Sequence, residues 1–402
     1  MKIKDGYLKA NSILFLTMLG YGLVTALLSV YLNKQGVSLA NIGLIFSVGA
    51  IIAGLFRVPI GILVDCLGKK RFLIIGAIGY PLFSIGLIYA STVSHYILLN
   101  LMVAFFDAVF WTAFSAHFFD VMSKGEEGIG MAGRNITLYT ATGIAPIISG
   151  VLATKFGFGN LFMLGAAISV SGILIALTLK DHNHAKKLCY QAMHEEYANI
   201  LKIKGLPLIA GIIFLVDFVF VFWSIFMPIW LLQVGVSLGV IGVLLSANLL
   251  IGVFLQIPIG KAIDKWPIRT ILIPGFLMFW LGGVLFFAFK NYISYFFNRA
   301  IMLGTGSDMA YWPAVSMLAK LTPTVDNGGA VALIFGLSAA IKGFGALAGG
   351  YLAQMFGIET VLVSISYLAL AAAIILIPLK ILKKKGTQFH KVHHHRAHIP
   401  LR

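Results

Sequence analysis

Long apolar runs, separated by short polar segments, occupy nearly all of the 402-residue chain. A run of about 20 residues can cross the hydrocarbon core of a bilayer as an α-helix. Lipid offers no partner to backbone polar groups, and the runs lack the alternation of barrel strands, so we predict helices. The predicted spans are residues 13–33, 40–62, 71–90, 96–118, 135–155, 160–179, 207–232, 239–262, 270–289, 293–318, 331–354 and 359–380. The pattern therefore predicts an all-α membrane protein with twelve transmembrane helices.

The two halves of the chain carry copies of one segment. Residues 36–65 and 235–264 are identical at 12 of 30 aligned positions, at an offset of 199 residues. Two copies of one apolar unit are typical of secondary transporters, so we predict two repeats of six helices. The predicted domains are an N-terminal six-helix bundle at 1–179, a cytoplasmic linker at 180–206, a C-terminal six-helix bundle at 207–382 and a cytoplasmic basic, His-rich tail at 383–402.

Composition and charge agree with a lipid environment. Hydrophobic residues make up 59% of the chain and charged residues 11%, too few to coat a soluble globule of this size. The net charge of +16 raises the question of nucleic acid, but the basic residues sit where predicted spans meet loops. With both termini in the cytoplasm, 24 of the 30 fall on the cytoplasmic side, as the positive-inside rule requires. We expect a multi-pass, monomeric protein of the cell membrane whose partner is the lipid bilayer and not nucleic acid.

The loop between predicted spans two and three carries the most specific motif. Residues 61–71 read GILVDCLGKKR, which resembles the G-x-x-x-D-x-x-G-[RK]-[RK]-[RK] loop of major facilitator superfamily transporters. Residues 260–269, GKAIDKWPIR, are a reduced copy that lacks the second glycine and most of the basic run. The resemblance implies that family's fold, with two six-helix repeats and alternating access. The candidate gating residues are Gly61, Asp65, Gly68, Lys69, Lys70 and Arg71, with Gly260, Asp264 and Arg269 in the second half.

These residue types suit a gate for physical reasons. Glycines let two helices approach closely, and an aspartate near a helix end can meet a helix dipole or a basic partner in the other half. The Lys and Arg cluster can anchor the turn at the lipid headgroups. The alternative is a basic loop that sets topology and a glycine that serves packing.

Acidic residues inside the predicted spans point to a central cavity. Residues 107–113 and 308–314 share the pattern D-x-x-[FY]-W-x-A, with Asp and Trp on one helix face. The family resemblance implies that spans 1, 4, 7 and 10 line the cavity. Intramembrane carboxylates are costly unless they face water, a partner or a substrate; the alternative is structural pairing with the intramembrane bases. The candidate cavity and coupling residues are Asp107, Trp111, Asp217, Asp308, Trp312, Arg57, Arg299 and Lys342.

Several of these residues keep more than one interpretation. Trp111 and Trp312 can stack on an aromatic or cationic ligand, or can pack between helices. Arg299 begins RAIMLGTG, which is similar to the family's span-four R-x-x-x-G-x-G pattern but is displaced by one residue and lies in the second half. Lys342 can pair with an aspartate or bind a substrate anion. Residues 143–150, GIAPIISG, resemble the G-x-x-G-P-x-x-G-G segment of drug:proton antiporters in part.

The expected function is transport driven by a gradient. No G-x-x-x-x-G-K-[ST] loop occurs, so we expect neither ATP hydrolysis, enzyme activity nor a cofactor. The histidines of the tail can bind metal, but we expect no functional metal site. We expect a proton-coupled secondary transporter that exports an amphiphilic or cationic small molecule. The alternatives are uptake of a nutrient such as a sugar or organic acid, and a lipid flippase or non-transporting membrane sensor.

The gating motif yields a first prediction. We expect Asp65→Asn to abolish most substrate flux in liposomes while leaving membrane insertion intact, because the carboxylate acts between states and not in the core. Asp264→Asn is the matched comparison and should be milder, since its loop has lost most of the basic cluster. Wild-type flux in the Asp65→Asn variant would contradict the gating role.

Overall fold

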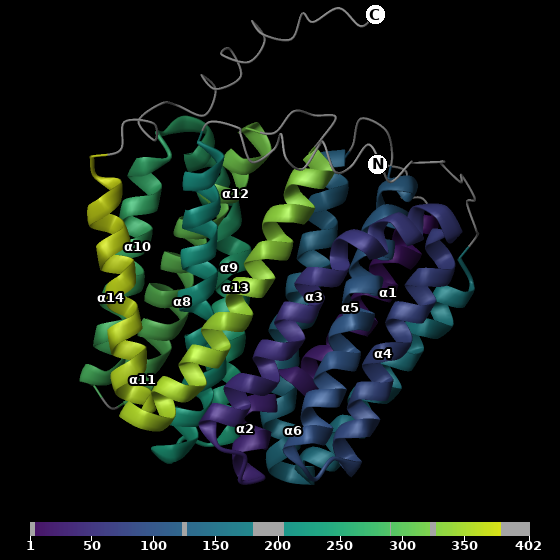
Figure 1. Cartoon of the computed structure of the whole chain (residues 1–402), viewed down its shortest axis with the longest axis horizontal. Coiled ribbons are helices and arrows are strands. Elements are labelled where there is room, and N and C mark those ends of the chain that lie inside the picture. Colours follow the sequence, from purple (N-terminus) through teal and green to yellow (C-terminus); the bar gives the residue numbers. More distant parts are fainter. Residues whose placement is uncertain (1–4, 123–126, 180–204, 290, 322–326, 379–402) are drawn as a thin grey trace, which may run out of the picture.

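The computed structural model describes residues 5–122, 127–179, 205–289, 291–321 and 327–378. Every regular element in these ranges is a helix, and Figure 1 shows the helices of each half grouped side by side in one bundle. The elements are α1 (Asp5–Thr25), α2 (Leu28–Lys34), α3 (Leu39–Leu67), α4 (Lys69–Tyr89), α5 (Val93–Val121), α6 (Glu127–Leu177), α8 (Leu206–Gln233), α9 (Leu238–Lys265), α10 (Arg269–Ala288), α11 (Tyr292–Phe296), the π-helix η1 (Phe297–Gly304), α12 (Thr305–Leu321), α13 (Asn327–Phe356) and α14 (Ile358–Leu376).

The predicted spans coincide with these helices, and an all-α membrane fold is confirmed. Nine stretches of the described residues are both long and apolar enough to cross a bilayer. One of the nine, α6, holds two predicted spans, because Gly157 at φ 79° and ψ 168° interrupts its helical backbone. Predicted span ten is divided among α11, η1 and α12. The predicted linker lies almost wholly outside the described residues, as does the predicted tail, so the domain boundaries stay predictions.

The duplication seen in the sequence is repeated in the backbone. Gly36 follows α2 with φ 78°, and Gly235 follows α8 with φ 86°. A side chain at either position would strain the turn, so glycine ends both helices. The next helix then starts in the same way in each half, because the hydroxyls of Ser38 and Ser237 accept hydrogen bonds from the first turns of α3 and α9. Equivalent sequence therefore produces equivalent turns.

The two halves contact each other mainly through two pairs of helices, α3 with α13 and α6 with α9. In the first pair, a Cβ atom on Gly43 would clash with the Ala346 carbonyl, and one on Gly350 would lie 2.6 Å from the Leu39 carbonyl oxygen. Without a hydrophobic driving force between helices in lipid, such close backbone packing supplies the attraction. The α3 and α13 backbones touch because these positions carry no side chain.

The second pair uses the same device. A Cβ atom on Gly150 of α6 would clash with the Leu238 carbonyl, and one on Gly242 of α9 would clash with the Pro146 carbonyl. The Ser246 hydroxyl also accepts a hydrogen bond of 3.1 Å from the backbone N–H of Ile147. The span-five segment that resembles an antiporter motif is thus a packing surface between the halves.

These glycine contacts gather toward one end of the bundle. We call it the distal end, defined by the Gly36 and Gly235 turns, and we call the opposite end proximal. Figure 1 shows α1 beginning and α14 ending at the proximal end. Gly43 and Gly242 lie within two turns of the distal turns, so the halves are packed backbone to backbone at the distal end. In the α3–α13 pair the close packing continues as far as Gly54 and Gly336.

We expect Gly43→Leu to lower the free energy of unfolding by about 1–3 kcal/mol, the usual cost of overpacking. Gly211→Leu is the matched control, since a Cβ atom at that exposed α8 position meets nothing within 4 Å. Thermal unfolding of the purified protein in one detergent measures the difference. Equal stability of the two variants would show that the Gly43 crossing does not hold the halves together.

Candidate functional site

The gating loop is a single-residue turn. α3 ends at Leu67, and Gly68, with φ 105°, joins it directly to α4, which begins at Lys69. Lys69 Nζ forms an ion pair of 2.6 Å with Asp120 Oδ2 near the end of α5. Arg57, Gly61 and Asp65 belong to α3, but the structure does not describe the surroundings of these three residues. The basic cluster therefore occupies the first turn of α4 and reaches sideways to a neighbouring helix end.

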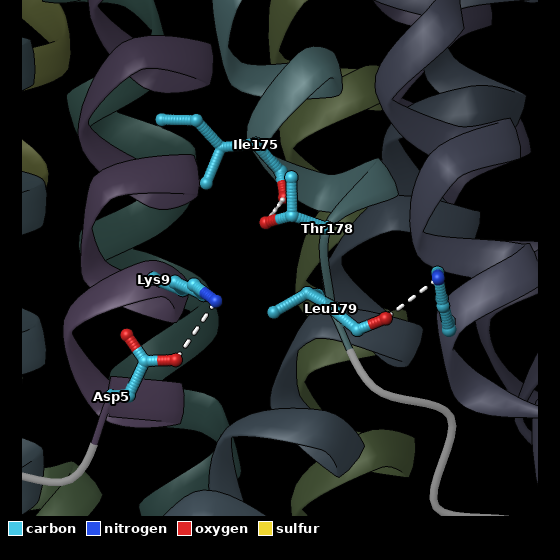
Figure 2. A network of polar contacts seen from close by, with 6 residues as sticks. Asp5, Lys9, Ile175, Thr178 and Leu179 are labelled. Carbon is cyan, nitrogen blue, oxygen red and sulfur yellow. Dashed lines mark hydrogen bonds and ion pairs between the residues drawn. The ribbon is translucent and has the colours of Figure 1, made fainter.

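The next basic residue caps another helix, and the second half does the same. Lys70 Nζ donates a hydrogen bond of 2.6 Å to the Leu179 carbonyl just beyond α6, which Figure 2 shows as a dashed line. Arg269 Nη1 donates one of 2.6 Å to the Ile377 carbonyl just beyond α14. Lys70 and Arg269 are 199 residues apart, the offset of the duplication. In each half a cation satisfies a carbonyl at the negative end of that half's last helix.

Other polar contacts at the proximal end are local. Figure 2 shows Asp5 and Lys9 of α1 paired at 2.8 Å, and the Thr178 hydroxyl donating to the Ile175 carbonyl. Arg71 and Asp264 are exposed, and Gly260 has open space around its Cα. Among the described side chains of the gating motif, Lys69, Lys70 and Arg269 bond only to groups of their own half. A gating contact between the halves remains a prediction.

Asp217 and Lys342 form a charge pair inside the second half. Asp217 of α8 is 5% exposed, and its Oδ1 lies 2.9 Å from Lys342 Nζ of α13. The Ser338 hydroxyl, one turn before Lys342, donates to the other carboxylate oxygen. A neutralised, hydrogen-bonded pair offsets the cost of placing a carboxylate at membrane depth. Of the two roles that the sequence left open for Lys342, the structure supports pairing.

Asp107 and Asp308, equivalent in the sequence pattern, have different surroundings. Asp107 of α5 accepts a hydrogen bond of 2.8 Å from the hydroxyl of Tyr80, a buried α4 residue. Asp308 of α12 accepts from the indole of Trp312 one turn later, and its carboxylate lies against Gly252 of α9. The expectation that Asp and Trp share a helix face holds at Asp308.

Arg299 is the most buried charge of the described chain, at 3% exposed. Its Nη1 donates a hydrogen bond of 2.8 Å to Asn248 Oδ1 of α9, and its guanidinium lies 5.8 Å from the Phe220 ring. Asp308 is close enough to interact with it electrostatically, although no direct ion pair joins the two in the described residues. Arg299 and Asp308 are thus neighbouring charges that are not in direct contact.

The π-helix η1 explains a change in the repeat offset. Tyr96 and Tyr295 are buried equivalents at an offset of 199, whereas Asp107 and Asp308 are equivalents at 201. The two additional residues of the second half fall where η1 lies, and π-turns hold more residues than α-turns. Such irregular turns are frequent at functional sites. Arg299 projects from this segment.

The repeat offset also identifies the first-half equivalents of the hydrogen-bonded pair Asn248 and Arg299. Gly49 and Asn100 occupy the places in the first half that Asn248 and Arg299 occupy in the second. A Cβ atom on Gly49 would clash with the Asn100 side chain, so Asn100 occupies the space that a side chain at position 49 would need. The second half has polar side chains at both places, and they bond to each other.

Sequence reasoning missed Arg134. The prediction began span five at residue 135, which left Arg134 in a loop, but α6 begins at Glu127 and includes it. Its guanidinium carbon lies 5.4 Å from the ring centroid of Trp111 and 5.8 Å from that of Phe114, both on α5. Residues 127–134 read EGIGMAGR, and their three glycines disfavour a helix, so the sequence carried no clear signal for this start.

Arg134 belongs to a group that reaches the other half. Tyr139, on the same helix, interacts electrostatically with Arg134 and with Asp308, and it hydrogen-bonds to the side chain of Gln256 on α9. Of the predicted aromatic residues, Trp111 therefore lies beside a cation, and Trp312 packs at 5.5 Å against Tyr311. The cavity residues of both halves approach each other along α6 and α9.

No group of three or more His, Cys, Asp or Glu side chains with metal-binding placement occurs within the described ranges. The His-rich tail lies outside them.

Comparison with known proteins gives one consistent result. The Major Facilitator Superfamily model matches residues 11–235 and 209–396. An uncharacterized MFS-type transporter of Methanocaldococcus jannaschii is 24% identical over 361 residues, which cover 86% of this chain and 90% of that protein. A multi-drug resistance efflux pump PmrA homolog of Lactococcus lactis is 24% identical over 337 residues, covering 77% and 80% of the two chains.

Two solved structures are similar in fold. A variant of the nucleoside transporter NupG superposes with a TM-score of 0.79 at 15% identity, covering 93% of this chain and 99% of that one. A POT family transporter in complex with 5-aminolevulinic acid gives 0.75 at 14% identity, covering 94% and 97%. At these identities the likeness establishes the fold alone.

The charge pair yields a stability prediction. We expect Asp217→Asn to cost about 1–3 kcal/mol of unfolding free energy, because it leaves Lys342 without its counter-charge. Lys342→Met in the Asp217→Asn background should recover most of that loss, since the double variant buries no unpaired charge. Thermal unfolding of the four proteins in a double-mutant cycle measures the coupling. Additive effects would contradict a direct pair.

Proposed function

Since the chain belongs to the major facilitator superfamily and is a membrane transporter, not an enzyme, we propose that it exports an amphiphilic or cationic small molecule in exchange for protons. Under this proposal it works by alternating access as a monomer in the cell membrane, with both termini in the cytoplasm. Its coupling residues are Asp308 and Asp107, and Arg299 adjusts the first of them.

The observation that carries the proposal is the arrangement of Asp308 and Arg299. A buried guanidinium lies near a carboxyl group, but the two are not locked in a direct ion pair. Movement of one group relative to the other changes whether the carboxyl group holds a proton. Proton binding at Asp308 then favours one arrangement of α12 and α9 over the other, which is the requirement for coupling a gradient to a conformational change.

The packing of the two halves supports export. The halves are joined by glycine crossings at the distal end, and positive-inside topology assigns the distal end to the exterior. On that assignment the structure is closed toward the outside, the state from which a cytoplasmic substrate loads. The name of the Lactococcus lactis relative, a multi-drug efflux pump homolog, points in the same direction.

The aromatic residues of the predicted cavity support an amphiphilic substrate. Trp111 and Trp312 lie on the two equivalent helices, α5 and α12, and each is only partly buried. Aromatic faces of this kind take flat apolar groups and cations. Nutrient uptake through a free Lys342 has less support, because that ammonium group is engaged by Asp217.

A second candidate is movement of a lipid. An apolar groove of about 420 Å³ runs between α8, α13 and α14 on the second half. Phe222, Leu352 and Phe356 line it, together with the hydroxyls of Thr360 and Ser364. An acyl chain fits such a lining, so labelled phospholipid is a necessary second substrate in any flux assay.

The decisive experiment compares Asp308→Asn with wild type in liposomes, with ethidium as the cationic amphiphile. We expect the variant to lose proton-driven accumulation, down to the level of empty liposomes, while it retains ethidium exchange, because the amide mimics the neutral acid. Glu359→Gln is the control, since its carboxylate is exposed in the first turn of α14.

If the Asp308→Asn variant accumulated ethidium with the same dependence on the pH gradient as wild type, Asp308 would have no part in the coupling mechanism. Flux of labelled phospholipid with no ethidium transport would favour the lipid candidate instead.

A further inference from the structure

Arg134 is placed in an unusual way for a basic residue near a helix start. It lies about two turns inside α6, half-buried, with its guanidinium carbon 5.4 Å from the ring centroid of Trp111 and 5.8 Å from that of Phe114. A cation–π contact of this kind uses no hydrogen-bond acceptor, so the N–H donors stay available to a ligand. The side chain therefore lies against α5 and is only half accessible to water.

The charge of Arg134 has no acidic partner among the described residues. Arg134 Nη1 donates a hydrogen bond of 3.4 Å to Asn135 Oδ1, a neutral group at the long end of the hydrogen-bond range. By contrast Lys69 pairs with Asp120, and Lys342 pairs with Asp217. Within the described residues most of its five donors are unused, and a partly desolvated guanidinium of this kind is suited to an anion.

The position faces the other half of the protein. Tyr139 interacts with Arg134 and also with Gln256 and Asp308, which belong to α9 and α12. Arg134 thus borders the region where the two halves meet, and Trp111 supplies an aromatic surface beside it.

The duplication argues that the fold itself does not need this arginine. Gly150 and Gly350 are equivalent at an offset of 200, and the same offset places Ile334 opposite Arg134. Ile334 is 1% exposed and belongs to the hydrophobic core of the second half. The same helix of the same repeat is therefore built with an apolar residue at this place.

We propose that Arg134 and Trp111 form a binding site for the anionic group of an amphiphilic substrate. The guanidinium edge holds a carboxylate, sulfonate or phosphate group in a bidentate manner, and the indole carries the adjoining aromatic or apolar body. This inference rests on the proposed export function and adds organic anions and zwitterions to the amphiphilic compounds that the protein takes.

The test uses two ligands with one ring system and opposite charge, naphthalene-2-sulfonate and (naphthalen-2-ylmethyl)trimethylammonium. Binding to the purified full-length chain in nanodiscs is measured by calorimetry at one pH, with no gradient. We expect wild type to bind the sulfonate more tightly than the ammonium compound. Arg134→Gln should weaken sulfonate binding about tenfold or more, the size of a lost charged hydrogen bond, and should change ammonium binding little.

Three further variants separate binding from structure. Arg134→Lys keeps the charge but loses the planar fork, so it should fold like wild type and weaken sulfonate binding severalfold. Lys9→Gln removes a basic residue that pairs with Asp5 at the same end of the bundle, and it should change neither affinity. Trp111→Leu should weaken both ligands, since it removes the aromatic surface they share.

The inference is overturned if Arg134→Gln and Arg134→Lys bind the sulfonate with wild-type affinity, or if wild type does not prefer the sulfonate. Because binding is measured without a gradient, the outcome is independent of proton coupling. Arg134-dependent binding without proton-driven export would sink the proposed function and leave the site standing. Proton-driven export without Arg134-dependent binding would contradict the proposed site and leave the proposed function unaffected.

Discussion

Hydrocarbon solvates neither charges nor backbone polar groups, and this single constraint organises the molecule. It forces the chain into helices that satisfy their own N–H and C=O groups. It also forces the remaining polar groups to find partners inside the protein. Lys342 neutralises Asp217, Asn248 accepts from Arg299, and Tyr80 donates to Asp107. Each of these bonds joins two helices of the same half. These polar contacts therefore stabilise each six-helix bundle separately.

Between the halves the same constraint leads to another solution. Helices in lipid gain little from bringing apolar side chains together, so attraction depends on close backbone approach. Gly43 and Gly350 meet across α3 and α13, and Gly150 meets α9 at its first turn. Contacts made of glycine leave few side chains interlocked. Such an interface can separate and close again with little rearrangement within either half, which suits two bodies that must rock.

The sequence was sufficient for the fold because its signals were long and repeated. Apolar runs of span length fixed the helices, and the copied segment around Gly36 and Gly235 fixed the two-repeat plan. The site was harder, because it depends on the rotation of each helix and on partners far apart in the chain. The pairing of Asp217 with Lys342 was one alternative among several, and Asn248 gave no signal of its own. Arg134 was assigned to a loop because the predicted span began at Asn135, while the helix begins earlier, at Glu127.

The π-helix of span ten also records the history of the chain. An insertion or deletion that preceded the duplication would have been copied into both halves, and the offset between equivalents would be constant. Instead the offset is 199 at Tyr295 and 201 at Asp308, with η1 between them. The length change therefore came after the duplication. Because it fell inside a membrane helix and not in a loop, it is visible as the wider turns of η1. In this segment the two repeats are no longer structurally equivalent.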